Sequence, residues 1–469
     1  MGKYKAYPEY KDSGIEWLDS IPSSWESAPI KYMALSKTSL FLDGDWIESK
    51  DISEEGIRYI TTGNVGEGFY KEQGMGFITQ ETFNKLNCTE VYEGDILISR
   101  LNNPIGRACI VPDLGHRIVT SVDNVIFRPD STYDERFLVY LFSSKDYFKH
   151  TSNLARGATM QRISRGLLGN IRVVFPIKEE QIQIANFLDH ETAKIDTLIE
   201  KQQQLIKLLK EKRQSVISHA VTKGLNPQAP MKDSGVEWLG EVPEHWSVCT
   251  LKRHANFIDG DRSSEYPNDK DLKDSGVLFL SSKNICDGKL NLKNANYISH
   301  QKFERLGRGK SIDGDLIVKV RGSTGRIGEL AIFESELLKH STAFINAQMM
   351  IIRVKESLNN FFLNNISQSH YWMEQLNLGA YGTAQQQLNN TVFANVVMVV
   401  PPLCEQHQIN AHLVLVINRF DDLMRKANNA IALMQERRTA LISAAVTGKI
   451  DVRNWQAPTS QNQAMEQTA

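Results

Sequence analysis

A long pattern of heptad-spaced apolar residues occurs twice in this chain, and it limits the folds that the chain can adopt. The first copy covers residues 180–222 and the second covers residues 405–447, so equivalent positions are 225 residues apart. Apolar residues at this spacing form a stripe along one face of a helix, and the stripe buries itself against a second helix. The sequence therefore predicts two long helices that pack together as an antiparallel coiled coil. The residues of the predicted seam are Leu188, Ile195, Leu198, Leu205 and Leu209 in the first helix and Leu413, Phe420, Leu423, Met434 and Leu441 in the second.

The two predicted helices also end alike. In both copies a basic pair precedes an Ala-Val-Thr segment and a glycine, with Arg213 and Gly224 in the first copy and Arg438 and Gly448 in the second. Basic residues suit the negative end of the helix dipole, and glycine is a common stop signal. About 40 residues at ~1.5 Å each give a length of roughly 60 Å. That length favours a spacer between domains over the alternative, in which each helix covers its own domain.

The segments before the two helices repeat as well. Residues 11–18 return at 232–239, each followed by a further tryptophan, Trp25 or Trp246. Residues 59–65 correspond to 279–285, and the Gly-Asp run at 94–98 corresponds to that at 314–318. Short runs of β-branched and aromatic residues, bounded by Gly, Asp and Asn, are typical of strands joined by tight turns. The tryptophans of the first repeated segment, among them Trp25, are expected to pack on a hydrophobic surface, with ligand stacking as the alternative.

These repeats predict an α+β architecture with two strand-rich globular domains in tandem, each followed by a long helix, and with internal pseudo-twofold symmetry. The chain ends in a stretch rich in Gln, Ala and Thr without apolar periodicity, for which we expect disorder. The predicted boundaries are 1–176 for the first domain, 177–225 for the first helix, 226–231 for a linker, 232–400 for the second domain, 401–452 for the second helix and 453–469 for the tail.

Composition narrows the possible functions. The net charge of −1 gives no overall positive field, so any nucleic-acid binding must depend on local patches. The sequence contains neither a secretory signal nor an apolar run of membrane-spanning length, so we expect a cytoplasmic protein without a membrane partner. The five cysteines form no C-x-x-C pair and the histidines lack metal-ligand spacing. We therefore expect reduced, mostly buried thiols and no metal site.

Motifs for catalysis are incomplete. Asn103-Pro104-Ile105-Gly106 resembles the base-holding motif of amino-methyltransferases but lacks its second proline and its aromatic residue, so we interpret it as a turn. Asp45, Glu48 and Lys50 match a nuclease pattern only loosely. Gly322-Ser323-Thr324-Gly325 lacks the spacing of a phosphate loop. The sequence thus predicts no catalytic, cofactor-binding or metal residues.

Local basic residues favour a nucleic-acid partner. Residues 147–178 include no acid, although such a charge run fits a solvated face equally well. Basic residues near one strand turn recur in the second half, and phosphate contacts are needed whichever bases are read. Gln385, Gln386 and Gln387 could read adenine edges or contact another subunit. The candidate DNA contacts are Arg100, Arg107, Arg156, Arg162 and Arg165 in the first half and Lys319, Arg321 and Arg326 in the second.

Two tandem strand-rich domains, each followed by a long helix with a Glu-Gln start after proline and an Ala-Val-Thr-Gly exit, resemble the specificity subunit of Type I restriction-modification systems. The most family-like segments are residues 436–450, Pro401-Pro402-Leu403 and Glu405-Gln406. The first copy departs from this pattern, with Lys223-Gly224-Leu225 where the second has Gly-Lys-Ile and with the single Pro176. These differences concern only local geometry.

The resemblance implies that each globular part is a target recognition domain that reads one half of a split double-stranded DNA sequence. It also implies that the helices set the half-site spacing and bind two DNA-methyltransferase (modification) subunits, with restriction/translocase subunits as further partners. S-adenosylmethionine, ATP and Mg²⁺ would then belong to the partner subunits. Two alternatives are a coiled-coil scaffold that binds no DNA and an enzyme with an unrecognised catalytic site.

Overall fold

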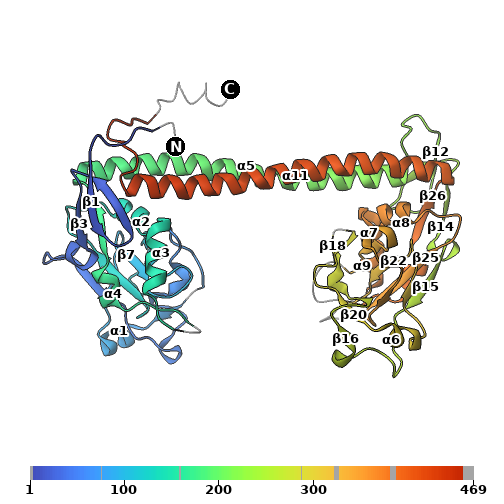
Figure 1. Ribbon diagram of the computed structural model, residues 1–469, viewed down its shortest axis with the longest axis horizontal. Coiled ribbons are helices and arrows are strands. Elements are labelled where there is room, and N and C mark those ends of the chain that lie inside the picture. Colours follow the sequence, from blue (N-terminus) through green and yellow to red (C-terminus); the bar gives the residue numbers. More distant parts are fainter. Residues whose placement is uncertain are drawn as a thin grey trace. The chain divides into compact units, whose positions relative to one another are not determined.

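The computed structural model describes residues 4–74, 76–157, 160–286, 288–321, 327–380 and 387–457 (Figure 1). The chain divides into two compact units, one formed by Met1–Gln202 with Asn429–Ala469 and the other by Gln203–Asn428. Each unit joins one strand-rich domain to a part of both long helices. Within the described residues, no helix is long and apolar enough to cross a membrane.

The first domain is built on a four-stranded antiparallel sheet in the order β4-β10-β7-β8. A three-stranded sheet, β6-β5-β9, and two strand pairs, β1-β2 and β3-β11, surround it. The strands are β1 (Tyr10–Ile15), β2 (Leu18–Pro22), β3 (Glu26–Pro29), β4 (Leu40–Asp43), β5 (Ile57–Ile60), β6 (Phe77–Ile78), β7 (Ile96–Ser99), β8 (Ala108–Ile110), β9 (Ile118–Thr120), β10 (Asn124–Arg128) and β11 (Arg172–Phe175). The helices are η1 (Ile30–Met33), η2 (Ser49–Asp51), η3 (Thr62–Asn64), α1 (Gln80–Leu86), α2 (Glu135–Leu141), α3 (Lys145–Leu154) and α4 (Arg165–Asn170).

The second domain repeats this plan around the sheet β15-β25-β22-β23, beside a five-stranded sheet in the order β16-β20-β17-β24-β21. Its strands are β12 (Met231–Asp233), β13 (Glu241–Pro243), β14 (Ser247–Thr250), β15 (Ala255–Asp259), β16 (Leu272–Lys273), β17 (Val277–Leu280), β18 (Ile285–Cys286), β19 (Lys289–Leu290), β20 (Asn296–Ile298), β21 (Lys310–Ser311), β22 (Leu316–Lys319), β23 (Leu330–Ile332), β24 (Ala343–Ile345), β25 (Met349–Val354) and β26 (Val397–Val400). Its helices are η4 (Leu251–Arg253), η5 (Asp269–Asp271), η6 (Ser282–Asn284), α6 (His300–Arg305), α7 (Ser335–Leu338), α8 (Asn360–Ser367), α9 (His370–Gly379) and α10 (Asn390–Ala394).

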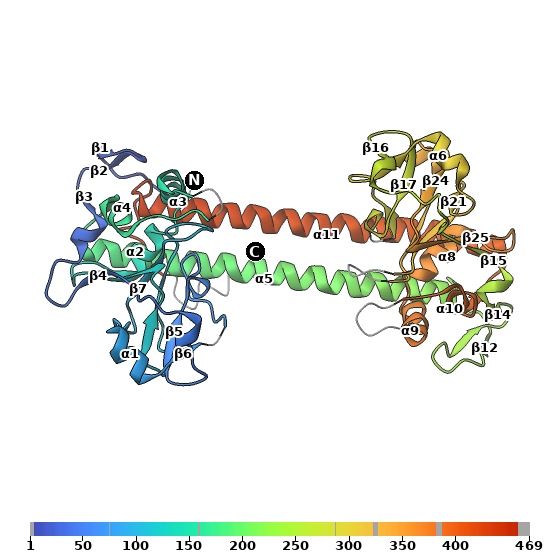
Figure 2. The same ribbon diagram turned by 90° about the horizontal axis from the view of Figure 1, so that it is seen from below.

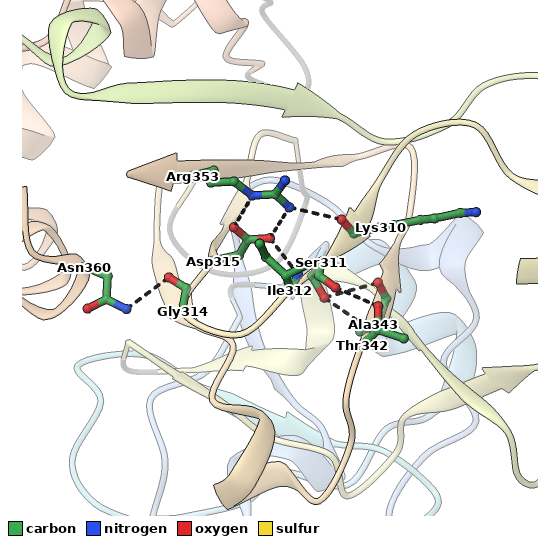
Figure 3. Close-up of polar contacts among 9 residues, drawn as sticks. All are labelled: Lys310, Ser311, Ile312, Gly314, Asp315, Thr342, Ala343, Arg353 and Asn360. Atoms are coloured by element: carbon green, nitrogen blue, oxygen red, sulfur yellow. Dashed lines mark hydrogen bonds and ion pairs between the residues drawn. The ribbon is translucent and has the colours of Figure 1, made fainter. Parts of the chain in front are cut away.

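A buried aspartate begins the central strand of each four-stranded sheet. Asp315, just before β22, accepts hydrogen bonds from Arg353 Nε at 2.8 Å and Nη2 at 2.7 Å and from the Ile312 backbone N–H at 2.8 Å (Figure 3). Asp95, just before β7, pairs with Arg128 in the same bidentate way, at 2.7 Å for both nitrogens. These contacts explain the repeated Gly-Asp that precedes each strand, because a buried carboxylate requires paired donors.

The hydrophobic core of each domain continues into the helices of its own unit. The long helices are α5 (Lys178–Lys223) and α11 (Leu403–Val446), as the heptads predict. In the first unit, Leu188 of α5 and Leu441 of α11 belong to the same core as Trp25. In the second unit, Ile217 of α5 and Leu413 of α11 share a core with Trp246. The predicted packing is therefore confirmed for Trp25 and Trp246, whereas Trp17 is half-buried and Trp238 is 39% exposed.

Within each unit the two helices run antiparallel (Figures 1 and 2). In the first unit, Gln183 contacts the carbonyl of Val452, just beyond α11, whereas Asp196 pairs with Arg438 of α11 at 2.9 Å. Residue numbers thus rise along α5 as they fall along α11. In the second unit Arg213 pairs with Asp421 at 3.6 Å, and the end of α5 approaches the start of α11. The predicted direction of packing holds in each unit.

The predicted seam needs a correction on one side of the helices. Leu198, Leu205 and Leu423 are 49%, 43% and 48% exposed, so they lie outside the seam. The residues after them, such as Ile199, are less exposed. Positions three and four residues beyond a seam residue lie on opposite flanks of the same helix face. On each helix the partner helix packs against the flank that carries the residue four positions beyond the seam residue, such as Ile199 four positions beyond Ile195. Of the other predicted seam residues, the buried ones are Leu188, Ile195, Leu413 and Leu441, and the half-buried ones are Leu209, Phe420 and Met434.

Two smaller predictions also change. The predicted tail begins with a packed segment, because the Trp455 ring lies 5.4 Å from that of Phe187; residues 458–469 lie outside the described residues. Cys88 and Cys109 are buried and Cys249 is half-buried, but Cys286 and Cys404 are exposed. The expectation of mostly buried thiols therefore holds for only part of the set.

Candidate nucleic-acid interface

The Glu-Gln pair at the start of each long helix anchors the domain that precedes it. Glu180 accepts a hydrogen bond from the Trp25 indole at 2.9 Å, and the equivalent Glu405 accepts one from Trp246 at 3.0 Å. Both indoles are at most 1% exposed, so each needs a partner for its N–H. The carboxylate thus links the strand-rich segment to the helix in both units.

The neighbouring glutamine makes a second link. The Gln181 amide donates to the carbonyl of Pro176 at 2.9 Å and accepts from the backbone N–H of Asp134, the N-cap of α2, at 2.9 Å. Gln406 repeats both contacts with Pro401 and with Asn359, the N-cap of α8. The Pro and Glu-Gln motif therefore has a structural role, because it fixes the start of the helix against its domain.

A second repeated element lies at the polar end of each four-stranded sheet. The second residue beyond the inner strand β7 or β22 pairs with a distant residue in an isolated antiparallel bridge, Leu101 with Arg162 in the first domain and Arg321 with Gln387 in the second. We call this element the cross-strand bridge. Its backbone contacts recur: Ile163 N–H donates to the carbonyl of Arg100 at 3.0 Å, as Leu388 N–H does to that of Val320 at 2.9 Å.

Polar side chains gather around the bridge of the first domain. Arg162 Nη2 pairs with Asp123 Oδ1 at 2.8 Å, whereas Arg100 and Arg165 pair with the two oxygens of Asp43 at 3.2 and 3.7 Å. The side chains of Arg162 and Arg165 are 42% and 41% exposed, so both can meet a ligand. Arg100 is buried, so Arg162 and Arg165 are the cations of this basic cluster that reach the surface.

The second domain carries different groups on the same backbone. Asp259 takes the place of Asp43 and accepts from the Asn390 amide at 2.9 Å, where the first domain has Arg165. Gln387 takes the place of Arg162. In the amide orientation that satisfies both groups, its oxygen accepts from Arg321 Nε at 3.3 Å and Nη2 at 3.2 Å. The arginine therefore comes from the opposite strand of the bridge.

A repeated Asp-Gly-Asp turn lies beside the bridge in both domains, and its first aspartate, Asp43 or Asp259, makes the contacts described above. Gly44 and Gly260 let two backbones meet, since a Cβ at either position would lie 2.4 Å from a carbonyl oxygen. The second aspartate, Asp45 or Asp261, then accepts a backbone N–H from a neighbouring loop. Burial raises the pKa of Asp45, whereas hydrogen bonds to Asp261, chiefly from Ser263, outweigh its burial and hold the pKa of that carboxyl below its usual range.

The residue after each turn is Trp46 in the first domain and Arg262 in the second. Trp46 is 67% exposed and follows Asp45, which forms a bridge to Ser121 beside the basic cluster. Sequence reasoning missed both residues. The signal that finds them is the repeat of Phe41-Leu42-Asp43-Gly44-Asp45 as Phe257-Ile258-Asp259-Gly260-Asp261.

Three of the candidate DNA contacts need correction, since Arg100, Arg107 and Lys319 are only 5%, 7% and 6% exposed. Arg107 donates to the carbonyls of Thr62, Val65, Leu101 and Pro104, and burial lowers its pKa and that of Arg100. Lys319 pairs with Glu329 at 2.7 Å. These three cations therefore bond to groups within their own domains and expose little surface.

The other candidates lie at the surface or outside the described residues. Arg156 is exposed and forms its own bridge to Arg162, which brings these two residues together. Arg165 and Arg321 lie at the two bridges. Arg326, Gln385 and Gln386 lie outside the described residues, as does the Gly322–Gly325 segment. The Asn103-Pro104-Ile105-Gly106 turn joins β7 to β8 as predicted.

Comparisons with known proteins agree with this duplicated plan. The sequence model of the family described as Type I restriction modification DNA specificity domain matches residues 24–208 and again residues 243–433. The chain is 22% identical to the MjaVIII specificity subunit of Methanocaldococcus jannaschii, over 95% of this chain and 98% of that protein. It is 25% identical to the EcoBI specificity subunit of Escherichia coli, over 89% of both.

Solved structures share the fold. A chain from a structure on complex assembly and conformational transition of the type I R-M system aligns with a TM-score of 0.67 and 16% identity, over 92% of this chain and 99% of that one. The HsdS subunit from Thermoanaerobacter tengcongensis aligns with a TM-score of 0.50 and 17% identity, over 92% and 98%. With two matched copies that cover most of its length, the chain belongs to the Type I restriction modification DNA specificity domain family.

Proposed function

We propose that this protein is the DNA-recognition subunit of a Type I restriction-modification complex, in which each domain reads one half of a bipartite double-stranded target. The observation that carries the proposal is the cross-strand bridge. Its backbone is the same in the two domains, but its polar groups are exchanged, with Arg162 and Arg165 in one and Gln387 and Asn390 in the other. Different donors and acceptors on one scaffold suit two domains that read different base sequences.

The helices would serve the complex in two ways. Their length supports a role in setting the half-site spacing. Their outer flanks carry exposed apolar side chains, among them Leu198, Leu205 and Leu423, which fit a surface that a partner covers. We propose two DNA-methyltransferase (modification) subunits as these partners, with restriction/translocase subunits added to them, in the cytoplasm. S-adenosylmethionine, ATP and Mg²⁺ would bind to those subunits, and this chain would contribute no catalytic residue.

Domain exchange tests the proposal in the assembled methyltransferase. Residues 26–175 are replaced by those of a relative with a different target, so that the exchange includes Arg162 and Arg165, and the methylated sequence is read genome-wide. We expect one half of the target to change while the other half and the gap stay as they were. A methylated sequence that changes in both halves, or that does not change, would contradict independent recognition. Methyl transfer by the purified single chain would overturn the non-catalytic role.

A further inference from the structure

Two arginines on the cross-strand bridges differ from ordinary phosphate contacts. Arg162 and Arg321 come from opposite strands of equivalent bridges, so each domain has one arginine in its bridge pair. Each lies beside an oxygen: Arg162 forms an ion pair with the Asp123 carboxylate at 2.8 Å, and Arg321 donates to the Gln387 amide oxygen at 3.2–3.3 Å in the amide orientation that satisfies both groups. This arrangement fixes the direction of a guanidinium, which a phosphate contact does not require.

The charge around Arg162 supports the same distinction. The carboxylate of Asp123 neutralises much of the charge of Arg162, which reduces its attraction for the phosphate backbone. What remains is a planar group with five N–H donors in a fixed fork, of which Nη2 contacts Asp123. An arginine oriented in this way matches the O6 and N7 acceptors of guanine in the major groove.

Comparison of the domains separates base readers from phosphate contacts. Phosphates are present at every step of a duplex, so a phosphate contact can keep the same residue in both domains. At the bridge, the Leu101–Arg162 pair becomes Arg321–Gln387, and Asp123 corresponds to Gln348. The side chains change while the backbone hydrogen bonds persist, as expected for positions that distinguish bases.

We infer that Arg162 and Arg321 are specificity-determining residues, each of which reads one guanine in its own half-site, and that Asp123 and Gln387 are the positioning residues that orient them. This inference rests on the proposed function and adds the residues that carry it. It predicts at least one guanine in each half of the target, read at equivalent places in the two domains.

The test uses the assembled methyltransferase with Arg162→Gln, Arg321→Gln and Asp123→Asn. Arg162→Gln should relax or change one base pair of the first half-site, with a loss of discrimination of roughly 5- to 150-fold, the range of one bidentate arginine–guanine pair. Arg321→Gln should do the same in the second half-site only. Asp123→Asn should affect the same base pair as Arg162→Gln, and restoring the carboxylate as Asp123→Glu should recover part of the discrimination.

Arg117 provides a matched control, because its side chain is 45% exposed and is held by Glu90 at 2.9 Å elsewhere in the first domain. Arg117→Gln should leave the methylated sequence unchanged. If Arg162→Gln instead weakens binding to all sequences equally and lowers the salt slope by about one, Arg162 is a phosphate contact and the inference fails. That result leaves the domain exchange valid, so failure of this inference differs from failure of the proposed function.

Discussion

Arg438 of α11 donates its Nε–H to Asp196 Oδ1 of α5 at 2.9 Å. The equivalent pair has the arginine on the other helix, with Arg213 of α5 lying 3.6 Å from Asp421 of α11. The two arginines occupy equivalent positions of the heptad repeat, and so do the two aspartates. Each pair lies within one unit. Both units therefore use the same antiparallel register between α5 and α11.

Exchanging the charges of this pair should test that register. Asp196→Arg places two cations together and should lower the free energy of unfolding by about 0.2–1 kcal/mol, the range for exposed pairs. Adding Arg438→Asp should recover that loss. Urea unfolding of the two single variants and the double variant measures the coupling, with Arg213 and Asp421 as a matched second cycle. Strictly additive effects would show that the pair makes no contribution in solution.

Removing the Glu180 carboxylate should destabilise the first unit. Glu180→Ala leaves the Trp25 indole and the Tyr7 hydroxyl, now at 2.9 and 2.6 Å from Glu180, without their acceptor, at a cost of about 1–3 kcal/mol. Glu179→Ala, at an exposed neighbouring position, is the control. Equal losses in chemical unfolding of the two variants would contradict the anchoring role.

Removing the arginine partner of the buried aspartate that precedes β7 or β22 should destabilise the domain that contains it. Arg353→Met leaves the Asp315 carboxylate, 1% exposed, with only backbone donors, and we expect a loss of about 3–5 kcal/mol. Arg128→Met should act alike through Asp95. Thermal or urea unfolding measures the change. A loss below about 1 kcal/mol would mean that water reaches the carboxylate and that its pairing is not structural.

Thiol labelling should separate the cysteines by burial. Burial raises the pKa of Cys88 to about 12 and that of Cys109 to about 12, and nearby Asp45 adds to the shift at Cys88. Both groups should therefore stay protonated and unlabelled by a maleimide as the pH rises from about 7 to about 9. Exposed Cys404 should label in the folded protein. Mass spectrometry before and after denaturation makes the comparison, and rapid labelling of Cys109 in the folded chain would contradict its burial.

Lengthening the helices tests the spacer role. A heptad inserted after Gln202 and another after Ala427 preserve the seam and add about 10 Å at ~1.5 Å per residue. At ~3.4 Å per base step this corresponds to roughly three base pairs. Methylome sequencing should find the same half-sites with a longer gap and some loss of affinity, because the domains must also follow the turn of the duplex. A functional complex with an unchanged gap would rule out the helices as the ruler.

The sequence predicted much of the fold because repeats and periodicity are properties of the chain itself. The heptads located α5 and α11, and the repeated Gly-Asp runs located β7 and β22. Buried Trp25 and Trp246 followed from their place in the repeated segment. The side of the seam did not follow, since Leu198 and Ile199 are both apolar and only the position of the partner helix distinguishes them.

What the sequence determined by itself is the duplicated architecture, because equivalent segments at a constant spacing must fold alike. What only the tertiary structure decided is which cations face outward. Arg100 and Arg162 are both arginines near a turn, yet one is buried beside Asp43 and the other is exposed beside Asp123. The direction of a side chain in an irregular segment depends on partners far along the chain. The composition of the cross-strand bridge therefore emerged only when residues about 60 positions apart met in space.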